Sequence, residues 1–156
     1  MSEKATLYEE MAHQARRLFG GERDPIANAA NIAALIWQTL PGLNWAGFYF
    51  RRRSHLVLGP FQGKPACSRI PKGSGVCGTA AATGETVLVG DVHTFDGHIA
   101  CDPASNSELV VPLKKGHFVI GVLDLDSPVL NRFDREDAAG LESLAKLWVA
   151  SSDDLP

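Results

Sequence analysis

The segment ELVVPLKKGHFVIGVLDLDS, residues 108–127, decides the fold of this chain. It contains two apolar runs, Glu108–Leu113 and Phe118–Leu125. The polar residues 114–117 between them form a sequence typical of a turn. The segment is therefore predicted to fold as an antiparallel hairpin.

The second run of this hairpin carries two acidic residues, Asp124 and Asp126. Because side chains at positions i and i+2 of a strand point to the same face, we expect both carboxylates on one face, together with Val122. Leu123 and Leu125 then point to the opposite face. Two carboxylates on one face of a sheet suit a cationic ligand.

An earlier hairpin is predicted from two runs rich in aromatic and β-branched residues, Trp45–Phe50 and His55–Leu58. The basic residues 51–53 and Ser54 separate the runs and are expected to form a solvated turn. Gly59 and Pro60 are expected to end the second strand. A further strand is predicted over residues 85–89.

Four helices are predicted from apolar residues at helical spacing and from capping residues at the helix ends. They cover residues 6–19, residues 24–40 with Asp24 as the cap, residues 76–83, and a last segment that begins at Asp134 and includes residues 141–148. Helices at both ends of a chain with two hairpins between them are typical of an α+β domain. We therefore expect a central antiparallel sheet with helices packed mainly on one face.

The composition indicates a single domain, residues 1–156 with a core at about 24–150, because 45% of the residues are hydrophobic and can fill an ordinary core. The formal net charge of −3 offers no basic surface, so we expect neither a nucleic acid nor a membrane as partner. The N-terminal residues 1–22 carry charges where a signal peptide has an apolar segment. No apolar run approaches the ~18 residues of a membrane span, and we expect a cytoplasmic protein.

The three cysteines, Cys67, Cys77 and Cys101, lie in stretches punctuated by glycine, proline or small polar residues. Cys101 stands in residues 96–107, DGHIACDPASNS, directly before Asp102. A cysteine kept for packing usually has apolar neighbours on a helix or strand, so Cys101 is predicted to have a chemical role. Thiols in the cytosol are normally reduced, which leaves redox catalysis, metal binding or passive burial for this set.

A metal site would combine these cysteines with His93 or His98. The spacing argues against it, because the sequence contains neither a C-x-x-C pair nor a compact histidine pair of the kind that structural zinc sites typically use. We therefore expect no metal.

Three sequence blocks resemble those of a known family: RIPKGSGVCGTA at residues 69–80, DVHTFDGHIACDPASNSELVVPL at 91–113 and IGVLDLDS at 120–127. They are similar to the free methionine-(R)-sulfoxide reductases, which are single GAF domains. The resemblance extends over about residues 26–147 and includes counterparts of all three cysteines. It implies a GAF-like fold and a thiol-dependent reduction of free methionine (R)-sulfoxide.

By this resemblance Cys101 is the nucleophile that attacks the sulfoxide sulfur and becomes a sulfenic acid. Cys67 is then the resolving thiol, which condenses with that sulfenic acid to a disulfide. Thioredoxin is expected to reduce the disulfide, and no cofactor is required. The role of Cys77 stays open between simple packing in the predicted helix and a second resolving thiol.

The resemblance assigns Glu108, Asp124 and Asp126 to the ammonium group and the sulfoxide oxygen of the substrate. Trp45 and Tyr49 lie four residues apart in one predicted strand and therefore share a face. They either pack in the core or form an apolar wall for the methyl group of the substrate, and the resemblance favours substrate contact for Trp45.

A different function remains open, since a GAF-type fold alone does not imply activity. The chain would then be a stand-alone sensor that binds a small molecule without converting it. Turnover, as opposed to saturable binding without turnover, distinguishes the two functions. In either case a homodimer through the terminal helices is expected.

Overall fold

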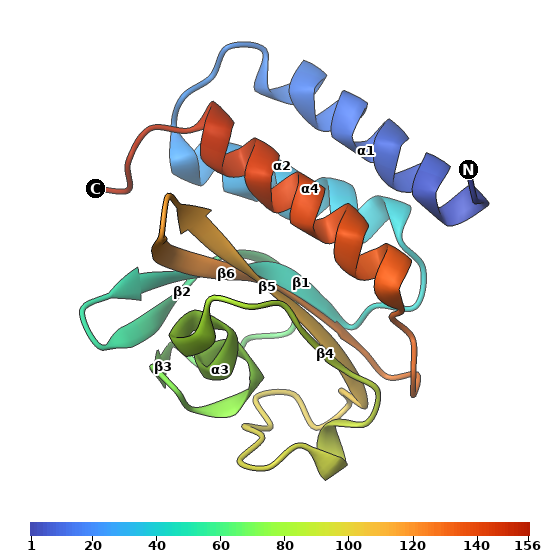
Figure 1. Cartoon of the computed structure of the whole chain (residues 1–156), viewed down its shortest axis with the longest axis vertical. Coiled ribbons are helices and arrows are strands. Elements are labelled where there is room, and N and C mark those ends of the chain that lie inside the picture. Colours follow the sequence, from blue (N-terminus) through green and yellow to red (C-terminus); the bar gives the residue numbers. More distant parts are fainter.

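The protein, described here by a computed structural model of all 156 residues, is built around a curved antiparallel sheet with helices on both faces (Figure 1). The helices are α1 (Glu3–Phe19), α2 (Pro25–Thr39), α3 (Gly75–Thr83) and α4 (Arg135–Ser151), with a short 3-10 helix, η1 (Val92–Thr94). The strands are β1 (Trp45–Arg52), β2 (His55–Gly63), β3 (Arg69–Pro71), β4 (Val87–Val89), β5 (Ser107–Lys115) and β6 (Phe118–Ser127). Their order in the sheet is β3-β2-β1-β6-β5-β4.

The predicted hairpin at residues 108–127 is confirmed as β5 and β6, which pair from Ser107 opposite Ser127 to Lys115 opposite Phe118. On its other side β6 pairs with β1, which sets Trp45 opposite Asp126. The two hairpins are thus joined at the middle of the sheet. The start of β1 with Trp45, the start of β5 with Glu108 and the end of β6 with Asp126 lie side by side.

The two faces of the sheet carry separate cores. Helices α1, α2 and α4 cover one face, where Leu123 and Leu125 are fully buried. Helix α3 and the loop before β5 lie over the other face, where Val122 packs against Cys77 in a smaller cluster. Three of the four helices therefore lie on one face, and Asp124 and Asp126 lie on the face covered by α3, as the two-residue period of the strand predicts.

The last helix begins at the predicted capping box. The Asp134 carboxylate accepts from the backbone N–H of Asp137, and the Asp137 carboxylate accepts from the backbone N–H of Asp134. Asp137 also ties α1 to α4, because it accepts from the Tyr8 hydroxyl at 2.7 Å and from the Lys4 ammonium at 2.9 Å. One buried carboxylate thus caps α4 and anchors the N-terminal helix.

The second strand of the first hairpin differs from the prediction. It continues through Gly59 and Pro60 to Gly63, with a register shift opposite the middle of β1. Proline is tolerated there because β3 pairs with residues 55–57 and the last bond on this side is from the Leu58 N–H to the Ser68 carbonyl, so that one side of β2 is a free edge from Gly59 onward. The very short β3 had no signal in the sequence, and the predicted strand 85–89 is shortened to Val87–Val89.

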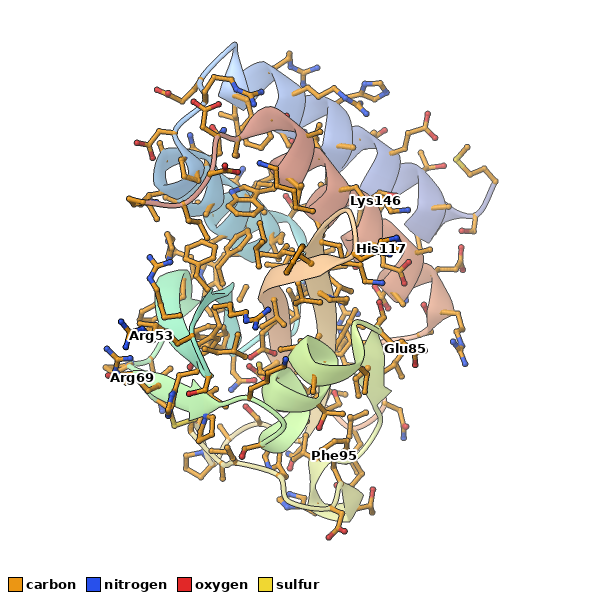
Figure 2. All side chains as sticks on the ribbon, turned by 60° about the vertical axis from the view of Figure 1, so that its left-hand side comes forward. Arg53, Arg69, Glu85, Phe95, His117 and Lys146 are labelled. Atoms are coloured by element: carbon orange, nitrogen blue, oxygen red, sulfur yellow. A yellow bond between two sulfur atoms is a disulfide. The ribbon has the colours of Figure 1, made fainter.

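The basic residues of the first hairpin lie at its tip, where Arg53 and the neighbouring Arg69 of β3 project outward (Figure 2). Arg51, Arg52 and Arg53 are all exposed, in agreement with a solvated turn. None of the helices is both long enough and apolar enough to cross a membrane.

Candidate functional site

Two of the three cysteines meet in a disulfide. Cys67 lies in the loop between β2 and β3, and Cys101 lies in the loop between η1 and β5. They are separated by 34 residues, yet their Cα atoms are 5.5 Å apart, within the range that a disulfide requires. Both cysteines are half-buried, whereas Cys77 is a free, buried thiol.

Side chains of β1 and of the residue preceding it hold the two cysteine loops. The Tyr49 hydroxyl donates to the backbone carbonyl of Cys67 at 2.8 Å. The Asn44 amide donates to the Asp102 carboxylate and to the Ser105 hydroxyl, each at 2.9 Å. Side chains at and near the start of one strand, β1, therefore hold both cysteine loops.

The carboxylate next to Cys101 is held in its ionised form. The backbone N–H of Ala104 donates to Asp102 at 2.9 Å, and this bond, together with the Asn44 amide, lowers the pKa of the Asp102 carboxyl. Asp102 thus adds a negative charge directly beside Cys101.

Three further carboxylates gather on the sheet below the disulfide. Glu108 of β5 lies opposite Asp126 of β6 in the strand register, and Asp124 is two residues earlier on the same face. Their exposed fractions are 6%, 8% and 5%. Burial, with the negative charges of the other carboxylates, raises the pKa of Asp124 and of Asp126 well above the usual aspartate range.

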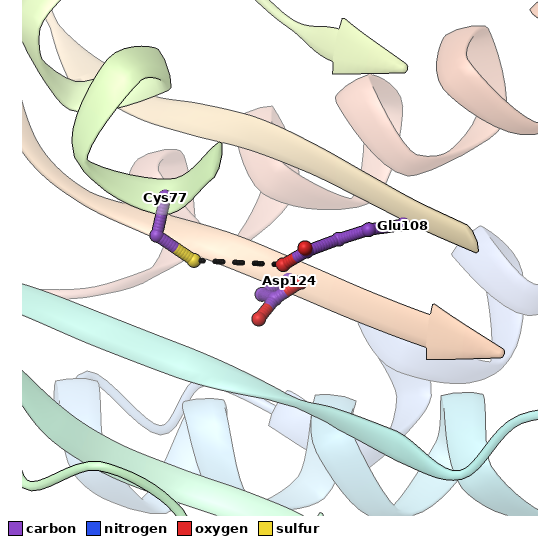
Figure 3. Close-up of side chains that lie close together, drawn as sticks. All are labelled: Cys77, Glu108 and Asp124. Carbon is purple, nitrogen blue, oxygen red and sulfur yellow. Dashed lines mark hydrogen bonds between the residues drawn. The ribbon is translucent and has the colours of Figure 1, made fainter. Parts of the chain in front are cut away.

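Cys77 and His98 flank Glu108. The Cys77 thiol, on α3, donates a long hydrogen bond to Glu108 Oε2 with a sulfur–oxygen distance of 4.0 Å, and Asp124 lies beside them (Figure 3). His98 Nε2 lies 3.6 Å from Glu108 Oε1. Burial and the nearby carboxylates raise the pKa of the Cys77 thiol, which favours the protonated form.

Aromatic rings form one wall of the same region. Trp45 stacks on Tyr49 at a centroid distance of 5.7 Å and on Phe61 of β2 at 5.2 Å. The indole N–H of Trp45 is buried and has no hydrogen-bond partner within the protein. Trp45 and Tyr49 thus share a face, and they contribute to the smaller core and to the cavity at once.

These groups surround a partly open cavity of about 40 Å³. It is bounded by the aromatic wall, the carboxylates, Cys77, His98, Cys101 and the first residues of α3. The Ser74 side chain makes no cap bond to the first turn of α3, so this end of the helix lacks a side-chain cap. No lysine or arginine lines the cavity, and its charged groups are therefore acidic apart from His98.

The structure brings together every residue that the sequence singled out for the site: Cys67, Cys77, Cys101, Glu108, Asp124, Asp126, Trp45 and Tyr49. Sequence reasoning missed Asn44, which holds the Cys101 loop, and Phe61, which stacks on Trp45. Asn44 follows a turn directly before β1, which is a weak signal for a residue that holds a loop. Phe61 lies beyond the Gly59–Pro60 pair, where no strand was expected.

The family model described as GAF domain matches residues 4–148. The chain is 52% identical to the free methionine-R-sulfoxide reductase of Escherichia coli, over 90% of this chain and 86% of that one. The structure superposes with a TM-score of 0.92 on a free methionine-R-sulfoxide reductase from Neisseria meningitidis in complex with its substrate. That protein is 48% identical, over 97% of this chain and 91% of the other.

A crystal structure described as a putative GAF sensor protein from Burkholderia vietnamiensis is similar as well. It has a TM-score of 0.93 and 57% identity, over 97% of this chain and 96% of the other. A match over nearly the whole chain at such identity decides the family. The chain belongs to the GAF domain family and, within it, to the free methionine-R-sulfoxide reductases.

Proposed function

We propose that the protein reduces free L-methionine (R)-sulfoxide to L-methionine with its own thiols. The observation that carries this proposal is the Cys67–Cys101 disulfide at the edge of a cavity with three clustered carboxylates. A redox-active pair needs two thiols that can reach each other, and the loops of this pair allow it. The E. coli and N. meningitidis relatives, both named as this reductase, support the reaction.

The reaction uses two thiols for each sulfoxide. The Cys101 thiolate attacks the sulfoxide sulfur and forms a sulfur–sulfur bond, while the sulfoxide oxygen takes up a proton. The oxygen then passes to the Cys101 sulfur as the sulfur–sulfur and the original sulfur–oxygen bonds break, which leaves Cys101 as a sulfenic acid and releases methionine. The Cys67 thiol then attacks the sulfenic sulfur, which forms the disulfide and releases water. A dithiol of the thioredoxin class returns both cysteines to thiols and is itself oxidised. Such recycling fits a cytoplasmic location.

The cavity offers a complementary group for each part of a free amino acid. Glu108, Asp124 and Asp126 suit its ammonium group, because no lysine or arginine of the cavity neutralises them. The uncapped N-terminus of α3 suits its carboxylate, since the first N–H groups of a helix favour an anion. Trp45 and Tyr49 provide an apolar surface for the methyl group of the sulfoxide.

The buried carboxylates also supply a proton. Burial, together with the negative charge of neighbouring carboxylates, raises the pKa of Asp124 and Asp126 well above the usual aspartate range, which favours a protonated carboxyl in the cluster. A protonated carboxyl facing the sulfoxide oxygen acts as general acid when that oxygen accepts negative charge. The same cluster thus binds the cation and donates the proton.

The test is a reaction of reduced protein with free methionine (R)-sulfoxide and no added reductant. We expect about one methionine per chain and the loss of two thiols, and Cys101→Ser should release none. Saturable binding without methionine release would refute the reductase and favour the sensor function, which the description of the Burkholderia vietnamiensis neighbour suggests.

A further inference from the structure

The Cys77 cluster has the composition of a metal-ligand set. Ligand atoms of Cys77, Glu108 and Asp124 all lie within 4.8 Å of one another, and all three residues are buried. His98 lies outside this set, although its Nε2 is 3.6 Å from Glu108 Oε1. Ligands at roughly 2.0–2.3 Å from a tetrahedral zinc ion lie about 3.3–3.8 Å apart, so these side chains need to move only slightly to bind one ion.

A second observation points to a cation at this place. Asp124 Oδ1 is buried and has no hydrogen-bond partner, so one oxygen of the cluster is unsatisfied by the protein itself. An unpartnered buried carboxylate oxygen is costly, and a bound cation removes that cost. No lysine or arginine lines the cavity to provide the charge instead.

The size of the cavity favours an ion over an organic ligand. About 40 Å³ holds a metal ion with a coordinated water, whereas pockets for organic ligands are roughly 300–1,000 Å³. The disulfide-closed chain therefore admits an ion where an amino acid does not fit. A thiol beside two carboxylates favours zinc and its soft analogue cadmium over magnesium or calcium.

We propose that the disulfide form of this protein binds one soft divalent cation, zinc or cadmium, through Cys77, Glu108 and Asp124, with water as the remaining ligand. The three protein ligands come from α3, β5 and β6, which explains why the sequence shows no close ligand pair. If the proposed function holds, the metal occupies the carboxylates that bind the substrate ammonium in the reduced form. The binding itself does not depend on that function.

The oxidised chain offers a specific probe, because Cys77 is its only free thiol. Oxidised protein is titrated with cadmium chloride at constant pH, and the thiolate-to-cadmium ultraviolet band is recorded beside calorimetric titration with zinc chloride. We expect one cation per chain with a band that saturates at one equivalent. Activity plays no part in these readouts, so failure of the metal site and failure of the reductase function are distinguishable.

Variants separate this site from surface binding. Cys77→Ser should abolish the band, and Asp124→Asn should weaken zinc binding on the order of tenfold or more while the band stays attainable at higher cadmium. His13→Ala, on the exposed face of α1, is the matched control and should change nothing. A wild-type chain without the band, or unaltered zinc affinity in folded Asp124→Asn and Glu108→Gln, overturns the proposal.

Discussion

The Tyr49 hydroxyl donates a 2.8 Å hydrogen bond to the backbone carbonyl of Cys67, so the aromatic wall of the cavity also holds the loop of one disulfide cysteine. Tyr49 is 2% exposed and stacks on Trp45. Burial raises the pKa of its hydroxyl, which therefore remains a donor throughout the neutral range. The Tyr49 side chain thus both lines the cavity and holds the Cys67 loop in position.

Tyr49→Phe keeps the ring and removes this bond. We expect methionine release in a single turnover to persist, while closure of the Cys67–Cys101 disulfide slows several-fold because the loop is less well positioned. Thiol loss followed by rapid quenching measures the closure. Tyr8→Phe is a matched control, since Tyr8 is the only other tyrosine and lies between α1 and α4. Equal rates in wild type and Tyr49→Phe would show that the bond does not position the loop.

Cys67→Ser should release one methionine per chain and then stop, even with thioredoxin present. We expect that Cys77 does not replace Cys67, because it is buried in α3 and its raised pKa favours the protonated thiol. A sulfenic-acid trap followed by mass spectrometry should find the adduct on Cys101. Cys77→Ser, in contrast, should still form the disulfide. Sustained turnover by Cys67→Ser would mean that Cys77 is a second resolving thiol.

The oxidised chain should bind free methionine sulfoxide at least tenfold more weakly than the reduced chain. The reason is that the disulfide-closed cavity of about 40 Å³ has no room for an amino acid. Calorimetric titration of the oxidised protein and of Cys101→Ser, which cannot close the disulfide, measures the difference. Equal affinity for both forms would indicate that the cavity opens without reduction.

Asp137→Ala should lower the free energy of unfolding by about 3 kcal/mol, because it removes a capping-box partner, leaves the Tyr8 hydroxyl without an acceptor and removes one of the two carboxylates that accept from the Lys4 ammonium. Denaturant unfolding followed by circular dichroism gives the value. Glu10→Ala, at an exposed position of α1, is the control and should change the free energy of unfolding by less than about 0.5 kcal/mol.

The stabilising contribution of Asp134 should be lost in acid. The Lys4 ammonium and the backbone N–H of Asp137 lower the pKa of the Asp134 carboxyl from 3.8 to about 2. A lowered pKa in the folded state stabilises the fold above the unfolded value, so the contribution is lost as the pH falls from about 4 to about 2. Asp134→Asn should flatten this part of the stability profile, whereas Asp96→Asn, at an exposed loop position, should leave it unchanged.

Local rules account for the parts of the fold that were predicted correctly. The β5–β6 hairpin follows from two apolar runs around a polar turn, and the capping box follows from Asp134 and Asp137 at fixed spacing. The alternation of strand side chains placed Asp124 and Asp126 on one face. Each of these features depends on residues within a few positions of one another, and for such residues the local sequence determines the geometry.

Contacts between residues far apart in the sequence could not be predicted without the tertiary structure. The strand β2 passes through Gly59–Pro60 because its neighbour β3 is short, and nothing near that pair reveals its neighbour. Asn44 holds the Cys101 loop through Asp102, 58 residues further along the chain. The sequence contains both partners of that bond without any sign that they meet.

The sequence by itself determined the α+β class, the strand faces and the residue types available for thiol and acid chemistry. The tertiary structure alone decided that Cys67 and Cys101 lie within bonding distance, that Glu108 joins the two aspartates in a site without lysine or arginine, and that their shared cavity is small. The physical reason is that distances across the sheet and the burial that shifts a pKa depend on how separate elements pack. Spacing along the chain fixes only what happens within one element.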